Sequence, residues 1–390
     1  MSFVNVNRKV LCEAFDFVKW VIPAKPIIVA DGNVSLKVSG STLIVSACDG
    51  IMGARAIIPI LNTEDVQEDL LVGCDPKRFG KAIAKDSAEV ITLEKVGDNL
   101  HVSDPQEGPD KFVTLACANM RRSSQINKWV PAQEDCLNDS VIRPDFFSQV
   151  LAFLDNFTTE GNGGNGKHDV VVLSESVAHT TNGVNLRGIC ASKELSFKSD
   201  VSLRKRYITP LVKTLANIES SSVIFKDSPQ IISVSTEDGT KQIVMPAHRK
   251  EPPVVPKEYL VSTGDTSIVN IKEIVKGLDR ISTSNYNTAT SLTGVDLKIS
   301  GEGELSKLQL VLEDNKASQT FSLSRKGGGT IEKTMDLNTL LRVLKTFSKS
   351  TSPKVFFGTE ETRFLKFVDV RTIGDKIGAF IAVCSYARKV

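Results

Sequence analysis

The sequence predicts an α+β protein made of six copies of one unit, in which an amphipathic helix packs on a small antiparallel sheet. Helix-like apolar periodicity recurs at a spacing of roughly 62 to 69 residues, and a regular spacing of this kind indicates a repeated unit. The intervals between the helices show the alternation of apolar and polar residues that is typical of half-buried strands. Cations recur on the polar faces of the helices. The six helices are expected to begin near Arg8, Asp75, Pro144, Arg206, Ile271 and Asp336.

The first two copies show the order of elements most clearly. In residues 1–60, a strand at Val4–Val6 leads into a helix, and three short strands follow between turns at Gly40 and Asp49-Gly50. Residues 70–118 repeat this order of strand, helix and further strands. The remaining copies are expected in residues 140–190, 200–247, 260–325 and 331–390.

Each helix combines an apolar stripe with a polar face at the spacing of an α-helix. In the last helix, Leu337, Leu340 and Leu344 fall in the stripe, whereas Arg342 and Lys345 fall on the opposite side. The third helix has no cation. We predict that the cations of the other five helices contact one common partner: Arg8, Lys19, Lys77, Arg78, Lys81, Lys85, Arg206, Lys213, Lys272, Lys276, Arg280, Arg342, Lys345 and Lys349.

Basic charge is concentrated on these helices. The whole chain has a formal net charge of +2, whereas the six predicted helices together carry about +8, so the rest of the chain is acidic. A chain with so small a net charge exerts no general attraction on nucleic acid, and any such binding must come from local patches. The alternative is that Lys and Arg serve only as good helix formers on solvated faces. Agreement among five of the six helices favours a shared binding surface.

The length and the linkers predict three domains. A chain of 390 residues is too long for one typical core. Two polar, proline-containing stretches, Met120–Glu134 and His248–Glu258, separate the copies into pairs. We therefore expect domains at residues 1–134, 135–257 and 258–390, each with two helix-plus-sheet halves.

Several classes of protein are excluded by what the sequence lacks. No apolar run reaches the roughly 18 residues of a membrane span, and the first residues do not form a signal peptide. The seven cysteines are odd in number and include no Cys-x-x-Cys pair, which favours reduced thiols in the cytoplasm. The four histidines are too far apart in sequence for a zinc motif. We expect a cytoplasmic protein without membrane association, metal or other cofactor.

One stretch matches the sequence pattern of a nucleotide-binding loop without its structural context. Residues Gly161 to Lys167 satisfy G-x-x-x-x-G-K, but a phosphate-binding loop follows a strand, places Ser or Thr after the lysine and leads into a helix. Here a helix precedes, His168 follows the lysine and a strand comes next. We predict an ordinary loop and no catalytic residues. An enzyme with an unrecognised site, using nucleotide at Lys167, is one alternative.

Four short strings, in their order and spacing along the whole chain, resemble the bacterial sliding clamp, the β subunit of the replicative DNA polymerase. Ile44 to Gly50 is similar to the family's first-domain strand pair around a Thr-Asp turn. Leu70 to Val102 follows its pattern of strand, proline-led helix, acidic turn and two strands. The string from His179 to Leu186 resembles its Thr-Asp-Gly-His-Arg-Leu segment, and Val254 to Lys257 its closing Val-Leu-Pro-Lys.

This resemblance implies a ring. Two three-domain protomers are expected to close head to tail as a homodimer, with the helices around a central hole and a continuous sheet outside. The helix cations then face the phosphates of double-stranded DNA without reading its bases, which gives sequence-independent and salt-sensitive contact. The implied function is that of a processivity factor, which a clamp loader ATPase places on DNA and which tethers the DNA polymerase.

The resemblance also implies two protein-binding regions. The family binds partner peptides in a pocket between the second and third domains, and the junction between protomers lies at the domain edges. The matching pocket residues are Thr181, Gly183, Val184, Leu186, Val254, Val255, Ser385, Tyr386 and Arg388. The matching junction residues are Phe112 and Leu115 on one edge and Ile281 on the other.

The sequence departs from the family pattern at the expected pocket. Val184-Asn185 replaces His-Arg, and the tail from Cys384 to Val390 lacks the family's Met-Pro-rich ending. We expect a divergent clamp of bacterial, plasmid or phage origin that acts where DNA is replicated in the cytoplasm. A second alternative is a nucleic-acid-binding scaffold that uses the same basic helices without forming a ring.

Overall fold

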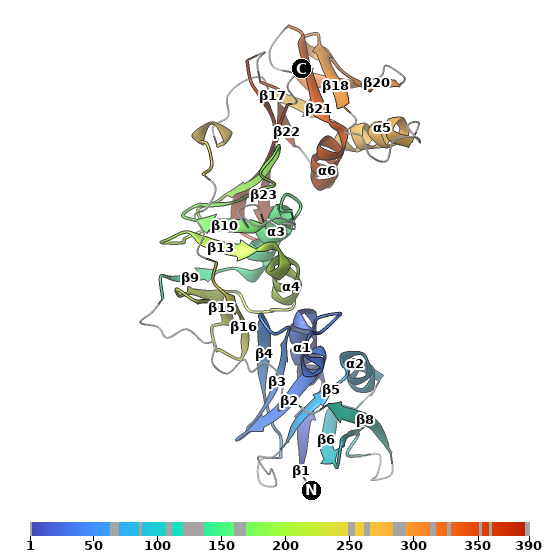
Figure 1. Ribbon diagram of the computed structural model, residues 1–390, viewed down its shortest axis with the longest axis vertical. Helices are drawn as coiled ribbons and strands as arrows, with labels where there is room; N and C mark the ends of the chain where they lie inside the picture. The colour runs from blue at the N-terminus through green and yellow to red at the C-terminus, as the bar shows by residue number, and fades with distance from the viewer. Residues whose placement is uncertain are drawn as a thin grey trace. The chain divides into compact units, whose positions relative to one another are not determined.

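The computed structural model describes residues 2–62, 70–85, 88–106, 111–118, 120, 136–159, 169–248, 254–260, 266–283, 294–312, 317–325, 329–350, 353–358 and 361–386. These residues form two compact units. Unit 1 comprises residues 1–148, 197–201 and 206–249, and unit 2 comprises residues 149–196, 202–205 and 250–390. Each unit contains one large antiparallel sheet and amphipathic helices (Figure 1).

The sheet of unit 1 has twelve strands in the order β1-β6-β7-β8-β5-β2-β3-β4-β16-β15-β14-β9. Its β4 and β16 are far apart in sequence, yet they pair directly, with Arg55 opposite Gln242. The first eight positions therefore come from residues 2–118 and the last four from the middle of the chain. The strands are β1 (Ser2–Asn7), β2 (Val34–Ser39), β3 (Thr42–Cys48), β4 (Gly53–Pro59), β5 (Leu71–Cys74), β6 (Val90–Val96), β7 (Asn99–Ser103), β8 (Phe112–Ala118), β9 (Asn138–Ile142), β14 (Val223–Asp227), β15 (Ile231–Thr236) and β16 (Lys241–Pro246).

Helices α1 (Arg8–Val18) and α2 (Pro76–Lys85) pack against each other in unit 1, which also contains most of α4 (Lys205–Leu215). The Asn7 side chain caps α1 by accepting a hydrogen bond from the backbone N–H of Val10 at 3.2 Å. The rings of Phe15 and Phe79 meet edge to face at 5.5 Å between centroids. Gly80 permits this approach, because a Cβ atom there would lie 2.7 Å from the Phe15 ring.

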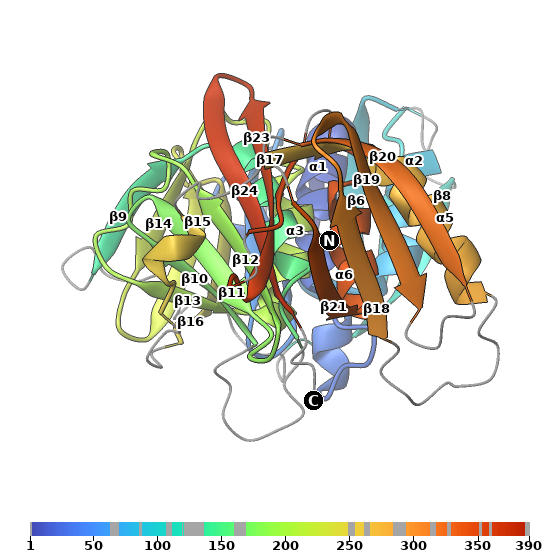
Figure 2. The ribbon, with the colours of Figure 1, turned by 90° about the horizontal axis from the view of Figure 1, so that it is seen from above.

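The sheet of unit 2 also has twelve strands, in the order β13-β10-β11-β12-β24-β23-β22-β17-β20-β19-β18-β21. Here β12 pairs with β24, with Ile189 opposite Ile381. Strands β23 and β24 form a long hairpin (Figure 2), in which Gly374 at φ +61° supplies the backbone conformation of a two-residue loop. The strands are β10 (Val170–Ser174), β11 (Val177–Thr181), β12 (Leu186–Ala191), β13 (Val201–Arg204), β17 (Thr266–Val269), β18 (Gly294–Ser300), β19 (Gly303–Leu312), β20 (Ser318–Arg325), β21 (Ile331–Asp336), β22 (Lys354–Phe356), β23 (Phe364–Ile373) and β24 (Lys376–Ser385).

Helices α5 (Ile271–Thr283) and α6 (Leu337–Phe347) pack together in unit 2. Asp336 caps α6, since its carboxylate accepts from the backbone N–H of Thr339 at 2.7 Å. Helix α3 (Pro144–Asp155) contributes its residues from Gln149 onward to this unit. The Phe153 ring of α3 lies 5.7 Å from Phe347 and 5.1 Å from Phe380, both roughly edge to face.

The predicted fold class is confirmed. Among the described residues there are six α-helices, each of which begins within one residue of its predicted start, and the sheets are antiparallel. The two compact units differ from the three predicted domains, because β9 and β14–β16 join one sheet while β10–β13 join the other. The division at residues 134 and 257 stays a prediction.

Candidate nucleic-acid interface

Among the described residues of unit 1, helix α2 carries the densest group of exposed cations. Lys77, Arg78 and Lys81 are exposed, whereas Phe79 and Ile83 on the opposite side are buried. No acidic residue lies within α2. Lys77 and Lys81 are separated by one helical turn, so their side chains project from the same face. This surface attracts anions through charge that the helix itself does not neutralise. The side chain of Lys85 lies outside the described residues.

The predicted cations of α1 are partly engaged by the protein. Nε of Arg8 donates to the backbone carbonyl of Ala88 at 2.8 Å, and this side chain is half-buried. Nζ of Lys19 lies 2.5 Å from Oδ1 of Asp16. These two residues have structural partners, and their contact with DNA stays a prediction.

Helix α4 presents two exposed cations, each beside an aromatic ring. The guanidinium of Arg206 lies 4.8 Å from the ring centroid of Tyr207, and Nζ of Lys213 lies 4.3 Å from that of Trp20. A cation at this distance over a ring is attracted by the ring's negative face. Both side chains are therefore oriented while they remain accessible to anions.

In unit 2, α5 and α6 expose most of the remaining predicted cations. Lys272, Lys276 and Arg280 are exposed on α5, and Lys345 and Lys349 are exposed at and beyond the end of α6. Nζ of Lys345 lies 3.3 Å from the carboxylate of Asp279 on α5, with both side chains about half exposed. Such a pair is weak in water, so Lys345 can exchange this partner for a phosphate.

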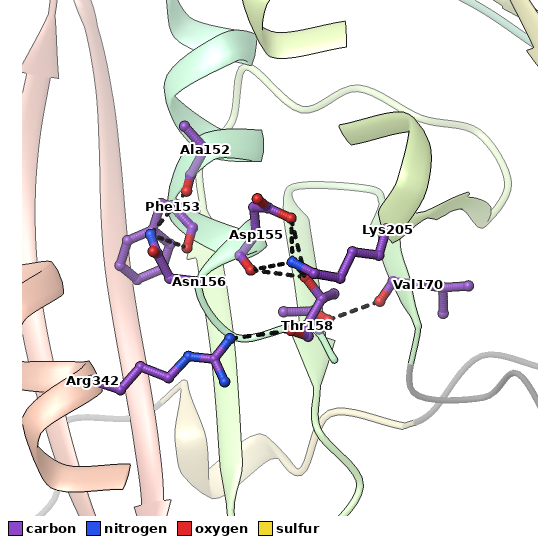
Figure 3. Close-up of polar contacts among 9 residues, drawn as sticks. Ala152, Phe153, Asp155, Asn156, Thr158, Val170, Lys205 and Arg342 are labelled. Atoms are coloured by element: carbon purple, nitrogen blue, oxygen red, sulfur yellow. Dashed lines mark hydrogen bonds and ion pairs between the residues drawn. The ribbon is translucent and has the colours of Figure 1, made fainter. Parts of the chain in front are cut away.

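Arg342 is the predicted cation that the fold uses most clearly (Figure 3). Its Nη2 donates to the backbone carbonyl of Thr158 at 3.2 Å, and partial burial lowers the pKa of the guanidinium. Nearby, Nζ of Lys205 donates to the carbonyl and to Oδ1 of Asp155, at 3.0 and 2.7 Å. A lysine at the carboxyl end of α3 satisfies a carbonyl that has no partner within the helix. Sequence reasoning missed Lys205, which belongs to α4 and has no periodic signal toward α3.

Taken together, the six helices contain 14 lysines and arginines and 6 acidic residues, a net charge of +8. Helix α3 contributes no cation, as predicted. Exposed side chains of this kind bind phosphate oxygens and make contacts that depend on salt and not on base sequence.

The predicted peptide pocket begins at a tight loop before β12. Oδ1 of Asn182 accepts hydrogen bonds from the backbone N–H groups of Val184, Asn185 and Leu186 at 2.9 to 3.0 Å. Gly183 lies at φ +77°, a conformation that glycine adopts at no steric cost. The loop therefore holds Val184 outward, where 85 % of it is exposed. Leu186 is buried and contributes to the core.

The apolar part of this region lies on the sheet face formed by β12, β24 and β23. Ile189, Ile381 and Val383 are buried there, with Val255 and Phe364 packed against them. Tyr259 packs on the same cluster, and Nη1 of Arg187 donates to the carbonyl of Val254 at 2.7 Å. Val254 itself is 81 % exposed. Sequence reasoning missed Ile189, Phe364 and Tyr259, although alternation along β12 and β23 carries the signal for the first two.

The remaining predicted pocket residues are held by backbone hydrogen bonds. The N–H of Ser385 donates to the carbonyl of Asn185 at 2.8 Å, which joins the loop to the end of β24. The hydroxyl of Tyr386 donates to the carbonyl of Phe357 at 3.1 Å, and burial raises its pKa. Thr181 is buried, with its Oγ1 accepting from the N–H of Gly183. Arg388 lies outside the described residues.

Comparison with solved structures decides the fold. The DNA polymerase III β subunit of Thermotoga maritima superimposes with a TM-score of 0.77 at 12% sequence identity, over 100% of both chains. The β subunit of Streptococcus pyogenes gives 0.76 at 16% identity, over 99% of this chain and 100% of that one. The sliding clamp of Bacillus subtilis gives 0.75 at 12%, over 100% and 99%.

The chain has the fold of a bacterial sliding clamp. No protein-family model matches the sequence, and no curated protein matches it significantly. At these identities the likeness extends to the arrangement of helices and strands along the full length and not to individual side chains.

Within the clamp fold, β8 presents an open edge at the predicted junction. In the part of the chain that the structure describes, Phe112–Ala116 pair with β7, whereas β5 pairs with β8 only at Cys117 and Ala118. Phe112 is 45 % exposed and stacks on His101 at 4.1 Å between centroids. Leu115 is buried. The side chain of Ile281 lies outside the described residues.

Three further observations concern metal binding, membrane spans and the glycine-rich stretch. In the described residues, no group of three or more His, Cys, Asp and Glu side chains is placed to hold a metal ion. No described helix is both long and apolar enough to cross a membrane. Gly161 to Lys167 lie outside the described residues, with α3 before them and β10 after.

Proposed function

We propose that the chain is a DNA sliding clamp, a processivity factor without catalytic residues of its own. It closes head to tail as a homodimeric ring around double-stranded DNA and tethers a DNA polymerase. The observation that carries this proposal is the row of exposed helix cations, above all Lys77, Arg78 and Lys81, in a chain with the clamp fold over its full length.

The charge suits encirclement better than tight binding. Independent phosphate contacts raise affinity and also make it strongly salt-dependent. A net helix charge of +8 supports contacts that form and break as the protein moves along the duplex. Retention then comes from the closed ring, which cannot leave a duplex that has no free end. A loader ATPase is part of this proposal, because a closed ring has to be opened on circular DNA.

Polymerase binding is assigned to the sheet face of unit 2 around Val255, Tyr259 and Phe364. Val184 and Val254 are both exposed. The loop of Val184 is joined to β24 because the carbonyl of Asn185 accepts from the N–H of Ser385, and the carbonyl of Val254 accepts from Arg187 of β12. A peptide with large apolar side chains fits such a surface, since these half-buried residues offer apolar area to an incoming chain. Ring closure is assigned to the open edge of β8 with Phe112 and Leu115, and to the region of Ile281. The site of action is the cytoplasm, including that of a phage host.

The experiment exploits the difference between threading and binding. The protein is allowed to diffuse onto a linear duplex tethered to a bead at one end, and the free end is then blocked by a bulky protein cap. We expect the protein to remain through a 1 M salt wash, where phosphate contacts are largely screened, and to leave when a restriction enzyme cuts off the cap. The matched control omits the cap and should lose the protein in the same wash.

The alternatives give different results in this assay. A non-ring scaffold leaves at high salt with or without the cap, and light scattering finds it monomeric at micromolar concentration. An enzyme that uses Lys167 loses function in the Lys167→Ala variant, whereas a clamp retains it. Release at high salt from the capped duplex contradicts the proposed function.

A further inference from the structure

A partly exposed tryptophan stands among the cations of unit 1. Trp20 lies in the short 3-10 turn Lys19–Val21 that follows α1, with 37 % of its surface exposed. Nζ of Lys213 lies 4.3 Å from its ring centroid and Nζ of Lys19 lies 5.1 Å from it. The indole is therefore a flat aromatic surface that two flexible ammonium groups contact.

A groove lies beside this ring. It is bounded by α1, α2 and residues 20–32, and its volume is about 1020 Å³. Gly80 and Phe15 bring the two helices together within it. Its lining includes Phe15, Lys19, Trp20, Pro23, Lys77 and Lys81.

The balance of charge in the groove favours an anion. Asp16 and Asp75 also line it, but each carboxylate already has a partner. Asp16 pairs with Lys19 at 2.5 Å, and Oδ1 of Asp75 accepts from the backbone N–H of Arg78 at 2.8 Å. Lys77 and Lys81 are exposed along one side, and Lys213 adds a third cation at the tryptophan.

We infer that this groove binds single-stranded DNA, with one base stacked on Trp20 and the backbone phosphates on Lys213, Lys77 and Lys81. An aromatic platform in a cationic groove is the arrangement by which proteins bind single strands irrespective of sequence. A duplex cannot use the ring in this way, because its bases are already stacked on one another. When a base covers the indole, the displaced ammonium of Lys213 remains within reach of that nucleotide's phosphate. The inference goes beyond the proposed function, which concerns duplex DNA alone.

The test uses the small number of tryptophans. The chain contains two, Trp20 and Trp129, so Trp129→Phe leaves Trp20 as the sole reporter. The variant is titrated with a twelve-nucleotide oligothymidine and, separately, with a blunt duplex of the same length at 50 mM salt. We expect the single strand to quench the fluorescence of Trp20 at concentrations at least about tenfold lower than the duplex, since stacking requires an unpaired base.

Variants separate stacking from charge. Trp20→Ala should weaken binding of fluorescently labelled oligothymidine by about tenfold to hundredfold, the effect of losing one base–aromatic stack, and Trp20→Phe should restore part of it. Lys213→Gln should lower the slope of log affinity against log salt by about one contact. Unchanged thermal unfolding of Trp20→Phe verifies the fold. Equal quenching by the two DNAs, or unchanged affinity of Trp20→Ala, overturns the inference.

The inference and the proposed function fail separately. Trp20→Ala should still be retained on the capped duplex, because ring closure does not involve the indole. If the wild-type protein is lost from the capped duplex while Trp20 still discriminates single strand from duplex, the clamp proposal fails and the groove stands. If the protein is retained on the capped duplex but the two DNAs quench Trp20 equally, only the single-strand inference fails.

Discussion

Helices α2 and α3 occupy equivalent places in the repeat and have different surfaces. Each begins with a proline, Pro76 or Pro144, at its first helical position, where the missing N–H costs nothing. Beyond its buried residues, α2 exposes Lys77, Arg78 and Lys81. The exposed residues of α3 include Gln149 and Ala152.

This difference shows that the repeat period determines where each helix forms, whereas the solvent-facing residues of a helix determine what that helix can bind. The α3 helix buries Phe146, Phe147 and Phe153 and receives the ammonium of Lys205 at its carboxyl end. The surface of α3 is therefore suited to packing against strands of the sheets. The α2 helix buries less and offers charge, which suits it to a polyanion.

The largest expected effect follows from reversing the charge of α2. Replacing Lys77, Arg78 and Lys81 together by Glu should weaken duplex binding at 50 mM salt by at least about tenfold, because three phosphate contacts become repulsive. Fluorescence anisotropy with a labelled duplex measures the change. These side chains are exposed, so thermal unfolding should shift little.

The matched control places acidic residues on α3. The pair Gln149→Glu and Ala152→Glu adds negative charge at exposed positions of an equivalent helix that has no cation to lose. Its effect on duplex affinity should be several-fold smaller. Equal losses in the two variants contradict the assignment of α2 as a DNA-binding helix.

For stability, the larger effect is expected from a substitution on α3 and the smaller from one on α2. Phe153→Ala removes a ring that packs on Phe157, Phe347 and Phe380, and should lower the free energy of unfolding by about 3–5 kcal/mol. Lys81→Ala on α2 removes an exposed side chain and should change it by less than about 0.5 kcal/mol. Urea unfolding followed by circular dichroism measures both, and a similar cost for the two substitutions contradicts the comparison.

The smallest effect concerns a cation that already has a partner. Asp279→Asn releases Lys345 from its half-exposed ion pair and should change stability by less than about 1 kcal/mol. Duplex affinity should rise slightly, by about twofold, since one carboxylate near the proposed DNA-binding cations is neutralised. A fall in affinity at 50 mM salt indicates instead that Asp279 orients Lys345.

The local pattern predicted the helices well because their signals are short-range. The 3.6-residue apolar stripes lie within each helix, and the caps that the structure shows at Asn7 and Asp336 act on backbone N–H groups only three residues away. The pairing of β4 with β16 and of β12 with β24 was not predictable in register, because those partners are distant in sequence.

The candidate site was predictable in composition and less so in detail. Exposure of Lys77 and Lys276 follows from helix periodicity alone. The hydrogen bond from Arg342 to Thr158 and the burial of Leu186 depend on tertiary packing that no single helix or strand encodes. Trp20 lies outside the apolar stripe of the helix that precedes it, and the structure distinguishes it by the approach of Lys213, which is distant in sequence.

The position of β24 constrains how the protein is made. Strand β24 lies inside its sheet, between β12 and β23, so that sheet cannot close before the ribosome has synthesised Ser385. The other sheet has all its strands once residue 246 has emerged. Synthesis therefore leaves the edge of β12 open from Ala191, where this strand ends, until β24 begins at Lys376. Termination before β24 yields a nascent chain in which this edge of β12 is open to pairing with other chains.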